Sequence, residues 1–251
     1  MNVVLLGATK GMGRALARVM AARGDRLFLL GRDEEDLERS ARDLDARSER
    51  EPAATPRAGA AFAYCDLERP ETFDPALEAA KAELGVVDAV VVTAGLFASQ
   101  DELEADPELC RRLLVVDFAH TVLFCERARR VLLAEGGTLC VFSSVAGDRG
   151  RRPVVLYGAA KAGLTRYLEG LDHRYRRSGL KVVCVKPGFV RTGMTEGLPA
   201  PPFAGEPDGV ARTVLRAIDR GKPVVYAPSM WALIMLVVRN LPRVVMRRVG
   251  F

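Results

Sequence analysis

A tyrosine and a lysine four residues apart, Tyr157 and Lys161, form the pair best suited to chemistry in this sequence. Residues four apart on a helix share a face, so the Lys161 ammonium would lie beside the Tyr157 phenol. A nearby cation favours the phenolate and would move the tyrosine toward acid–base chemistry near neutral pH. Ser144 follows the apolar run 138–142, a predicted buried strand, so its hydroxyl could hydrogen-bond a carbonyl. Together the three residues could move a proton onto or off a carbinol oxygen.

A glycine-rich turn near the N-terminus could hold the phosphates of a dinucleotide. Its glycines are Gly7, Gly11 and Gly13, and it lies between the apolar run 1–6, a predicted parallel strand, and a helical pattern over 14–23. Glycines let the backbone approach a pyrophosphate, and the free N–H groups of a helix N-terminus favour its charge. The alternative interpretation is an ordinary tight turn.

In this order and spacing, the segments resemble the short-chain dehydrogenase/reductase family from the N-terminus to about residue 192. The resemblance implies an oxidoreductase with Ser144, Tyr157 and Lys161 as catalytic residues. It places Asp66 near an adenine ring and the segment 187–192 around a nicotinamide, and Ala94–Gly95 matches the second half of the family's Asn-Asn-Ala-Gly turn. It also implies a homodimer or homotetramer that assembles through the helix bearing Tyr157.

The sequence departs from the family pattern at Asp117, where the family usually has an asparagine that supports a water chain to the lysine. An aspartate accepts hydrogen bonds as asparagine does, but it adds a negative charge and removes the amide donor. We interpret Asp117 as a fourth catalytic residue that connects Lys161 to water. The alternatives are a loss of activity and an aspartate with only a local structural partner.

The charges at the end of the second predicted strand, 26–30, favour NADP(H) over NAD(H). Gly31 stands where NAD-preferring sites place an acid, Arg32 follows it, and Lys10 lies inside the glycine turn. Guanidinium and ammonium groups make charge-assisted hydrogen bonds to a 2′-phosphate. Asp33 is predicted to cap the next helix instead. The predicted cofactor-binding residues are Gly7, Thr9, Lys10, Gly11, Met12, Gly13, Arg32, Asp66, Leu67, Ala94, Gly95, Tyr157, Lys161, Pro187, Gly188, Val190 and Thr192.

The alternation of strand-like and helical segments predicts an α/β fold, a single Rossmann domain with a doubly wound parallel sheet and helices on both faces. The apolar runs are 3–6, 27–30, 86–92, 139–142, 182–185 and 224–226. We assign residues 1–226 to this domain and 227–251 to a basic amphipathic C-terminal segment. Residues 46–59 are predicted to form a surface loop, and the proline-rich stretch 198–207 either a lid over the substrate or an ordinary connection.

The composition argues against several other classes of protein. The 5 cysteines have no metal-like spacing, and Cys65, Cys140 and Cys184 lie in or beside predicted strands, which indicates reduced core residues and a cytoplasmic protein. His120 and His173 have no second ligand nearby, so no metal site is expected. The net charge of +5 comes from the tail rather than from a broad basic face, so nucleic acid is not an expected partner.

The C-terminal segment combines apolar residues with arginines. Residues 230–238 are all apolar, but a bilayer-spanning helix needs roughly 20 such residues. Pro242 is predicted to divide the segment into two short helices. An apolar face beside arginines is typical of a helix that lies on anionic lipid, so we expect peripheral contact with the inner face of the membrane, the alternative being packing on protein. The expected apolar arc comprises Trp231, Met235, Val238, Val245 and Val249.

The segments 188–195, 224–228 and 241–243 resemble one branch of the family, which contains the reductase subunit of decaprenylphosphoryl-ribose 2-epimerase. That resemblance implies a ketone substrate linked to a lipid through phosphate, with Arg149, Arg151 or Arg152 facing the phosphate; another keto-lipid is the alternative. We therefore predict an NADP(H)-dependent ketone reductase. The alternative from another functional class is a nucleotide-binding sensor or a silent subunit of a larger complex.

Overall fold

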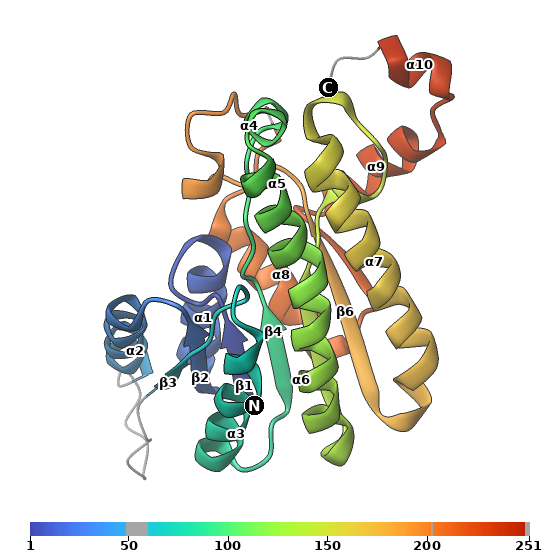
Figure 1. Cartoon of the computed structure of the whole chain (residues 1–251). Helices are drawn as coiled ribbons and strands as arrows, with labels where there is room; N and C mark the ends of the chain where they lie inside the picture. Colours follow the sequence, from blue (N-terminus) through green and yellow to red (C-terminus); the bar gives the residue numbers. More distant parts are fainter. Residues whose placement is uncertain (49–59, 202, 249–251) are drawn as a thin grey trace.

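The computed structural model describes residues 1–48, 60–201 and 203–248 (Figure 1). Within them, a parallel sheet has the strand order β3-β2-β1-β4-β5-β6-β7. The strands are β1 (Asn2–Leu6), β2 (Arg26–Gly31), β3 (Ala61–Tyr64), β4 (Ala89–Val92), β5 (Gly137–Phe142), β6 (Leu180–Pro187) and β7 (Val224–Ala227). The strand order reverses direction between β1 and β4, which is where open α/β sheets bind ligands. The predicted fold class is therefore confirmed.

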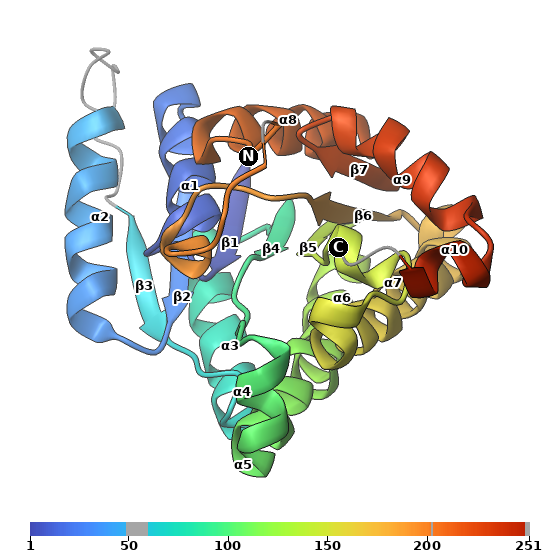
Figure 2. The ribbon, with the colours of Figure 1, turned by 90° about the horizontal axis from the view of Figure 1, so that it is seen from above.

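Helices cover both faces of the sheet because the strands are apolar on both sides (Figure 2). One face carries α1 (Gly11–Arg23), α2 (Glu34–Ser48) and α8 (Pro207–Arg220). The other carries α3 (Phe73–Leu84), α6 (Thr121–Glu135) and α7 (Val155–Tyr175). Two short helices, α4 (Gln100–Ala105) and α5 (Pro107–Leu114), lie above the carboxyl ends of the strands in Figure 1.

Three predicted boundaries need correction. The first helix begins at Gly11 rather than residue 14, so the glycine turn runs directly into it. Residues 46–48 continue α2 instead of starting a loop, and the remainder of the predicted loop, 49–59, lies outside the described residues. The proline-rich stretch 198–207 ends one residue earlier than predicted, because α8 begins at Pro207. Within the stretch, Gly205 forms an isolated β-bridge with Val190.

The C-terminal segment forms α9 (Met230–Asn240) and α10 (Arg243–Arg248), separated at Pro242 as predicted. Trp231, Met235 and Val238, which were expected on a lipid-facing arc, are instead buried against the domain. The expected arc was wrong for these three residues because they fill the space beside the end of β6. Among the described residues of the segment, the large apolar side chains that are exposed are Met230, Leu233, Leu236, Val237, Val244 and Val245; Val249 lies outside the described residues. No helix of the described chain is long and apolar enough to cross a membrane.

The cysteines behave as core residues. Cys65, Cys140 and Cys184 are buried and free, as predicted. Burial raises the pKa of the Cys65 thiol to about 12, which leaves it protonated and unreactive at neutral pH.

Candidate active site

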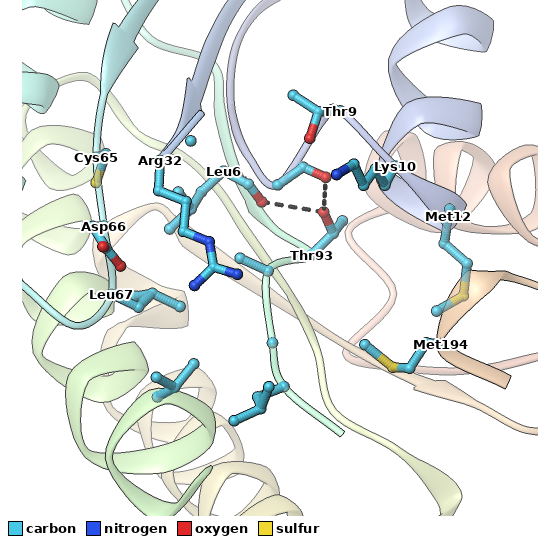
Figure 3. Close-up of a pocket in the computed structure, with 18 of the residues that line it drawn as sticks. Leu6, Thr9, Lys10, Met12, Arg32, Cys65, Asp66, Leu67, Thr93 and Met194 are labelled. Atoms are coloured by element: carbon cyan, nitrogen blue, oxygen red, sulfur yellow. Dashed lines mark hydrogen bonds between the residues drawn. The ribbon is translucent and has the colours of Figure 1, made fainter. Parts of the chain in front are cut away.

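The glycine turn forms one wall of a pocket at the carboxyl ends of β1, β2, β3 and β4 (Figure 3). Gly7 and Gly11 have φ angles of +95° and +51°, which disfavour other residues. A Cβ at Gly13 would lie 2.1 Å from the Gly7 carbonyl oxygen, so only glycine fits there. The Thr93 hydroxyl contacts the Leu6 and Gly7 carbonyl oxygens at 3.1 and 2.9 Å and fixes the turn against β4 (Figure 3). The N-terminus of α1 thus opens onto the pocket, as an anion site requires.

Most of the predicted cofactor residues line this pocket, which we call the cofactor cleft. They are Gly7, Thr9, Lys10, Gly11, Met12, Gly13, Arg32, Asp66, Leu67, Ala94, Gly95 and Thr192. The cleft also contains residues that the sequence analysis did not identify: Glu68, Thr93, Leu96, Arg112, Val116 and Met194. The Asp66 carboxylate holds the loop after β3 in the cleft wall, since one of its oxygens accepts the Glu68 N–H at 2.9 Å. The backbone turn and the cationic side chains fit the phosphates of a dinucleotide.

The two predicted cations, Lys10 and Arg32, line the cleft, and each has an acidic partner. Lys10 pairs with Asp36 at 3.0 Å, and Arg32 extends between Asp66 and Thr93 with its Nη1 3.3 Å from Glu68 (Figure 3). Gly31 ends β2, so no acid stands at the strand end, but Glu68 reaches Arg32 from the loop after β3, a contact that the sequence analysis did not identify. Glu68 also accepts two bonds from Arg112, at 2.6 and 2.8 Å, and this hydrogen bonding lowers its pKa.

Asp33 has the helix-capping role that was predicted for it. Its carboxylate accepts the Asp36 N–H at 2.9 Å at the start of α2. The side chain is therefore engaged with the helix rather than with a ribose.

The three predicted catalytic residues meet at the carboxyl end of β5. Tyr157 and Lys161 share one face of α7, with the Lys161 Nζ 5.6 Å from the centre of the tyrosine ring. The Ser144 hydroxyl accepts the Ala146 N–H at 3.1 Å, which leaves its own proton available to a substrate oxygen. The Phe97 ring meets the Tyr157 ring edge-on at 5.2 Å and fixes its orientation.

Asp117 pairs with Lys161 and lies in the π-helical segment Val115–His120 between α5 and α6. Its Oδ2 atom is 3.1 Å from the Lys161 Nζ, and its Oδ1 atom accepts the Leu96 N–H at 2.6 Å. Both side chains are almost completely buried. A Cβ at Gly95 would lie 3.2 Å from Oδ1, so the glycine makes room for the carboxylate. The carboxylate therefore connects the lysine to the backbone of Leu96, a residue that lines the cofactor cleft.

Burial and charge act in opposite directions on the two titrating groups. Burial raises the pKa of Tyr157 and the Asp117 carboxylate adds to this, whereas Lys161 and Ser144 oppose it; the net pKa is above the ordinary value. The expected net decrease was therefore wrong, because the prediction from spacing left out burial. For Lys161, burial lowers the pKa, but the charge and hydrogen bond of Asp117, together with Tyr157, more than offset this and the net pKa is raised. Lys161 is thus held charged and Tyr157 protonated.

The remaining predicted cofactor residues lie at the end of β6. Pro187 is the last residue of that strand, and Val190 is buried. Gly188 packs against the indole of Trp231, where a Cβ would lie only 2.0 Å from Nε1. The Phe203 ring meets the indole edge-on, with ring centres 5.2 Å apart. Helix α9 therefore supports this wall of the site, a contact that the sequence analysis missed.

Neither histidine has the surroundings of a metal ligand. The Nδ1 atom of His120 lies 2.6 Å from the Leu67 carbonyl oxygen, a contact that occupies this ring nitrogen. Among the residues that the structure describes, no group of His, Cys, Asp or Glu side chains could hold a metal ion.

Comparison with known proteins gives matches over most of the chain. The family model for short chain dehydrogenase matches residues 1–201. An uncharacterized oxidoreductase of Mycobacterium tuberculosis is 34% identical over 98% of this chain and 96% of its own. Carbonyl reductase family member 4 of Danio rerio is 29% identical over 86% of this chain and 90% of its own. A crystallised variant of actinorhodin polyketide ketoreductase with NADPH has a similar fold, with a TM-score of 0.78 and 21% identity over 89% of this chain and 94% of its own.

Proposed function

The chain belongs to the short-chain dehydrogenase/reductase family of oxidoreductases, and we propose that it reduces a ketone to a secondary alcohol with NADPH. The observation that carries the proposal is the row Asp117–Lys161–Tyr157, in which the first two side chains are buried and the third lies beside Ser144. A protonated phenol beside a charged lysine is suited to give a proton to a developing alkoxide. The carbonyl reductase among the relatives and the ketoreductase of similar fold support a carbonyl substrate.

In this mechanism each residue has a defined part. NADPH, when bound, supplies the hydride to the carbonyl carbon. The Ser144 hydroxyl orients the carbonyl oxygen, and Tyr157 gives its phenolic proton to that oxygen. The Lys161 ammonium stabilises the phenolate that remains, and Asp117 holds Lys161 in place. The proton lost from Tyr157 is replaced from solvent, with Asp117 and Lys161 as the start of the path.

Turnover of a ketone panel by the purified protein, with NADPH and with NADH, tests this function. The panel contains a 2-keto pentose on a polyprenyl phosphate, a long-chain keto-lipid and a short soluble ketone. We expect selective oxidation of NADPH with at least one of them. Binding of NADPH without turnover of any ketone would contradict the proposal and would instead fit a nucleotide sensor.

Two features of the cofactor cleft support a preference for NADP(H). Arg112 holds Glu68 with two short bonds, whereas the contact of Arg32 with Glu68 is single and longer, at 3.3 Å. The Arg32 side chain is 61% exposed, so most of its N–H donors are free to bind a 2′-phosphate. Lys10, at the entrance of the glycine turn, adds a second cation.

Replacing Arg32 with glutamine should reduce the preference for NADPH. A hydrogen bond to a charged group contributes about 1.5–3 kcal/mol, so the ratio of kcat/KM for NADPH to that for NADH should fall about 10- to 100-fold. Steady-state kinetics with both cofactors measures the ratio. The control is Arg69→Gln, because Arg69 is exposed and lies outside the residues that line the cleft. An unchanged ratio in Arg32→Gln would refute the assignment.

We further propose that the substrate is a keto-lipid or lipid-linked keto-sugar and that the enzyme meets it at the inner face of the membrane. The support is the outer side of α9, where Leu233 and Leu236 are 66% and 53% exposed. Arg239, Arg243 and Arg247 follow on the same segment and would face anionic headgroups. The resemblance to the epimerase-subunit branch remains a prediction.

The double replacement Leu233→Gln and Leu236→Gln should weaken binding to vesicles of phosphatidylglycerol and phosphatidylcholine by about 10-fold or more, since each leucine loses apolar area that lipid would cover. Co-sedimentation of protein with the vesicles measures this. Val86→Asn is the matched control, because Val86 is exposed but lies after α3, outside the segment. Equal sedimentation of all three proteins would exclude this face as the membrane contact.

Assembly into a homodimer or homotetramer is the last part of the proposal. The helix pair α6 and α7 and the segment before α6 expose the apolar side chains Phe118, Leu123 and Val155. Covering such side chains with a second copy of the chain would remove them from water. Analytical ultracentrifugation of the purified protein measures its oligomeric state; a monomer would contradict this part of the proposal.

A further inference from the structure

A buried acid, Asp148, lies in the loop after β5 and has no part in the proposed mechanism. Its Oδ1 atom is 2.5 Å from the Lys186 Nζ, and its Oδ2 atom accepts the Tyr226 hydroxyl at 2.6 Å. The Asp148 and Lys186 side chains are only 3% and 7% exposed. Lys186 and Tyr226 are register partners on β6 and β7, so both reach the carboxylate from one face of the sheet. We call the three residues the Asp148 network.

Each member of the Asp148 network stands next to a part of the active site. Asp148 ends the 3₁₀ turn that Ser144 begins. Lys186 directly precedes the segment 187–192, whose last residue lines the cofactor cleft. Tyr226 lies on β7, which leads into α9, the helix that supports the same segment. Since β5, β6 and β7 lie side by side (Figure 2), the carboxylate joins the loop that carries the serine to the segment beside the cofactor.

Stability alone does not call for charged groups at this place. Taking a carboxylate and an ammonium out of water is costly, and apolar side chains of similar volume often give equal or greater stability. An apolar contact, however, tolerates a small shift between the two segments that it joins. Hydrogen bonds of 2.5 and 2.6 Å to the two oxygens of one carboxylate fix both the distance and the direction between segments. The Asp148 network therefore fixes the relative position of the segments that meet at the active site.

We propose that Asp148 is a positioning residue for ketone reduction: it sets the place of Ser144, which orients the carbonyl, relative to the segment 187–192, which is predicted to hold the nicotinamide. This inference rests on the proposed ketone reduction. Asp148 is not among the described residues that line the cofactor cleft, so it acts through these two segments rather than on the reacting atoms. A misplacement of about 1 Å between reacting groups can lower a rate about 10²-fold, so the network has a large effect on turnover.

The kinetic test separates turnover from cofactor binding. Asp148→Asn keeps the size of the side chain but removes the charge, so Lys186 and Tyr226 no longer share one carboxylate. We expect kcat per NADPH-binding site to fall about 10- to 100-fold, while the Kd of NADPH, which depends on the cofactor cleft, changes less than about 3-fold. Tyr226→Phe removes one hydrogen bond and leaves the ion pair, so this milder variant should lower kcat about 3- to 10-fold. NADPH oxidation and fluorescence titration measure the two quantities.

The matched control is Asp25→Asn, which changes another buried acid. The Asp25 side chain is almost completely buried and pairs with Arg23 at 2.7 Å, but it lies before the first residue of β2, at the opposite edge of the sheet from the site. This variant should also lose stability but keep its kcat per NADPH-binding site. An unchanged kcat in Asp148→Asn, or an equal fall of kcat in both variants, would overturn the proposal.

The anisotropy of nicotinamide emission at saturating NADPH tests the positioning without turnover. A ring held by the segment 187–192 turns with the whole protein, whereas a ring beside a looser segment also moves by itself within nanoseconds. The anisotropy should therefore be lower in Asp148→Asn than in the parent protein and in Asp25→Asn. Equal anisotropy in the three proteins would overturn the proposal. A lower anisotropy in Asp148→Asn, with no turnover of any ketone by the parent protein, would support the positioning role and refute ketone reduction.

Discussion

Replacing Tyr157 with phenylalanine is expected to lower kcat for ketone reduction by about 10²- to 10⁴-fold, the range that a positioned general acid contributes. The phenol is the acidic group beside Ser144, and its raised pKa keeps it protonated at neutral pH. Phenylalanine keeps the ring that packs on Phe97 at 5.2 Å, so the variant loses the proton donor without losing the packing. NADPH oxidation at saturating ketone concentration measures the effect.

The matched control is Tyr167→Phe, which removes a hydroxyl from the same helix. The Tyr167 hydroxyl donates to Glu126 at 2.7 Å, away from the residues that line the cofactor cleft. This variant should keep its turnover, and both variants should retain NADPH binding in a fluorescence titration. Turnover by Tyr157→Phe within a few-fold of the parent protein would show that another group supplies the proton.

The parts of the fold and site that sequence could predict depend on local pattern. Buried parallel strands are continuous apolar runs, so β1, β2 and β6 were identifiable from runs such as 3–6, 27–30 and 182–185. Tyr157 and Lys161 were identifiable as a pair because a helix fixes the relation of residues four apart. The capping role of Asp33 follows from its place one residue before α2.

The parts that could not be predicted are contacts between segments far apart in the chain. Glu68 meets Arg32 and Arg112 only because the loop after β3 passes between β2 and α5. Trp231 contacts Gly188 from a helix more than 40 residues further along the chain, whereas the sequence pattern was equally compatible with a tryptophan that faces lipid. The direction of the Tyr157 pKa shift likewise required the burial of the site, which spacing does not give.

The second large effect is expected at Asp117, where the partners of the carboxylate explain why an aspartate is present. The Leu96 N–H and the Lys161 ammonium are both donors, at 2.6 and 3.1 Å, and a carboxylate can accept from both. An asparagine amide could accept from only one and would turn its NH₂ group toward the other. We therefore expect Asp117→Asn to lose about 1–3 kcal/mol of unfolding free energy, and Asp117→Ala, which leaves a buried lysine unpaired, about 3–5 kcal/mol.

The pH dependence of this loss distinguishes an ion pair from simple packing. In the parent protein the pKa of Lys161 is raised above its ordinary 10.5, so its contribution is fully present below that pH and is lost only as pH rises through the folded-state pKa. In Asp117→Ala the largest influence that opposes burial is gone, so we expect the pKa of Lys161 to fall below its ordinary value. The unfolded state then binds more protons, and the variant gains stability as pH rises. The loss of unfolding free energy measured by urea unfolding should therefore be smaller at pH 10 than at pH 7.

The control is Asp74→Ala, which breaks the exposed pair with Arg127 and should lower the unfolding free energy by under about 1 kcal/mol at both pH values. A deficit for Asp117→Ala that is the same at pH 7 and pH 10 would mean that Asp117 supports the site by packing rather than by its charge.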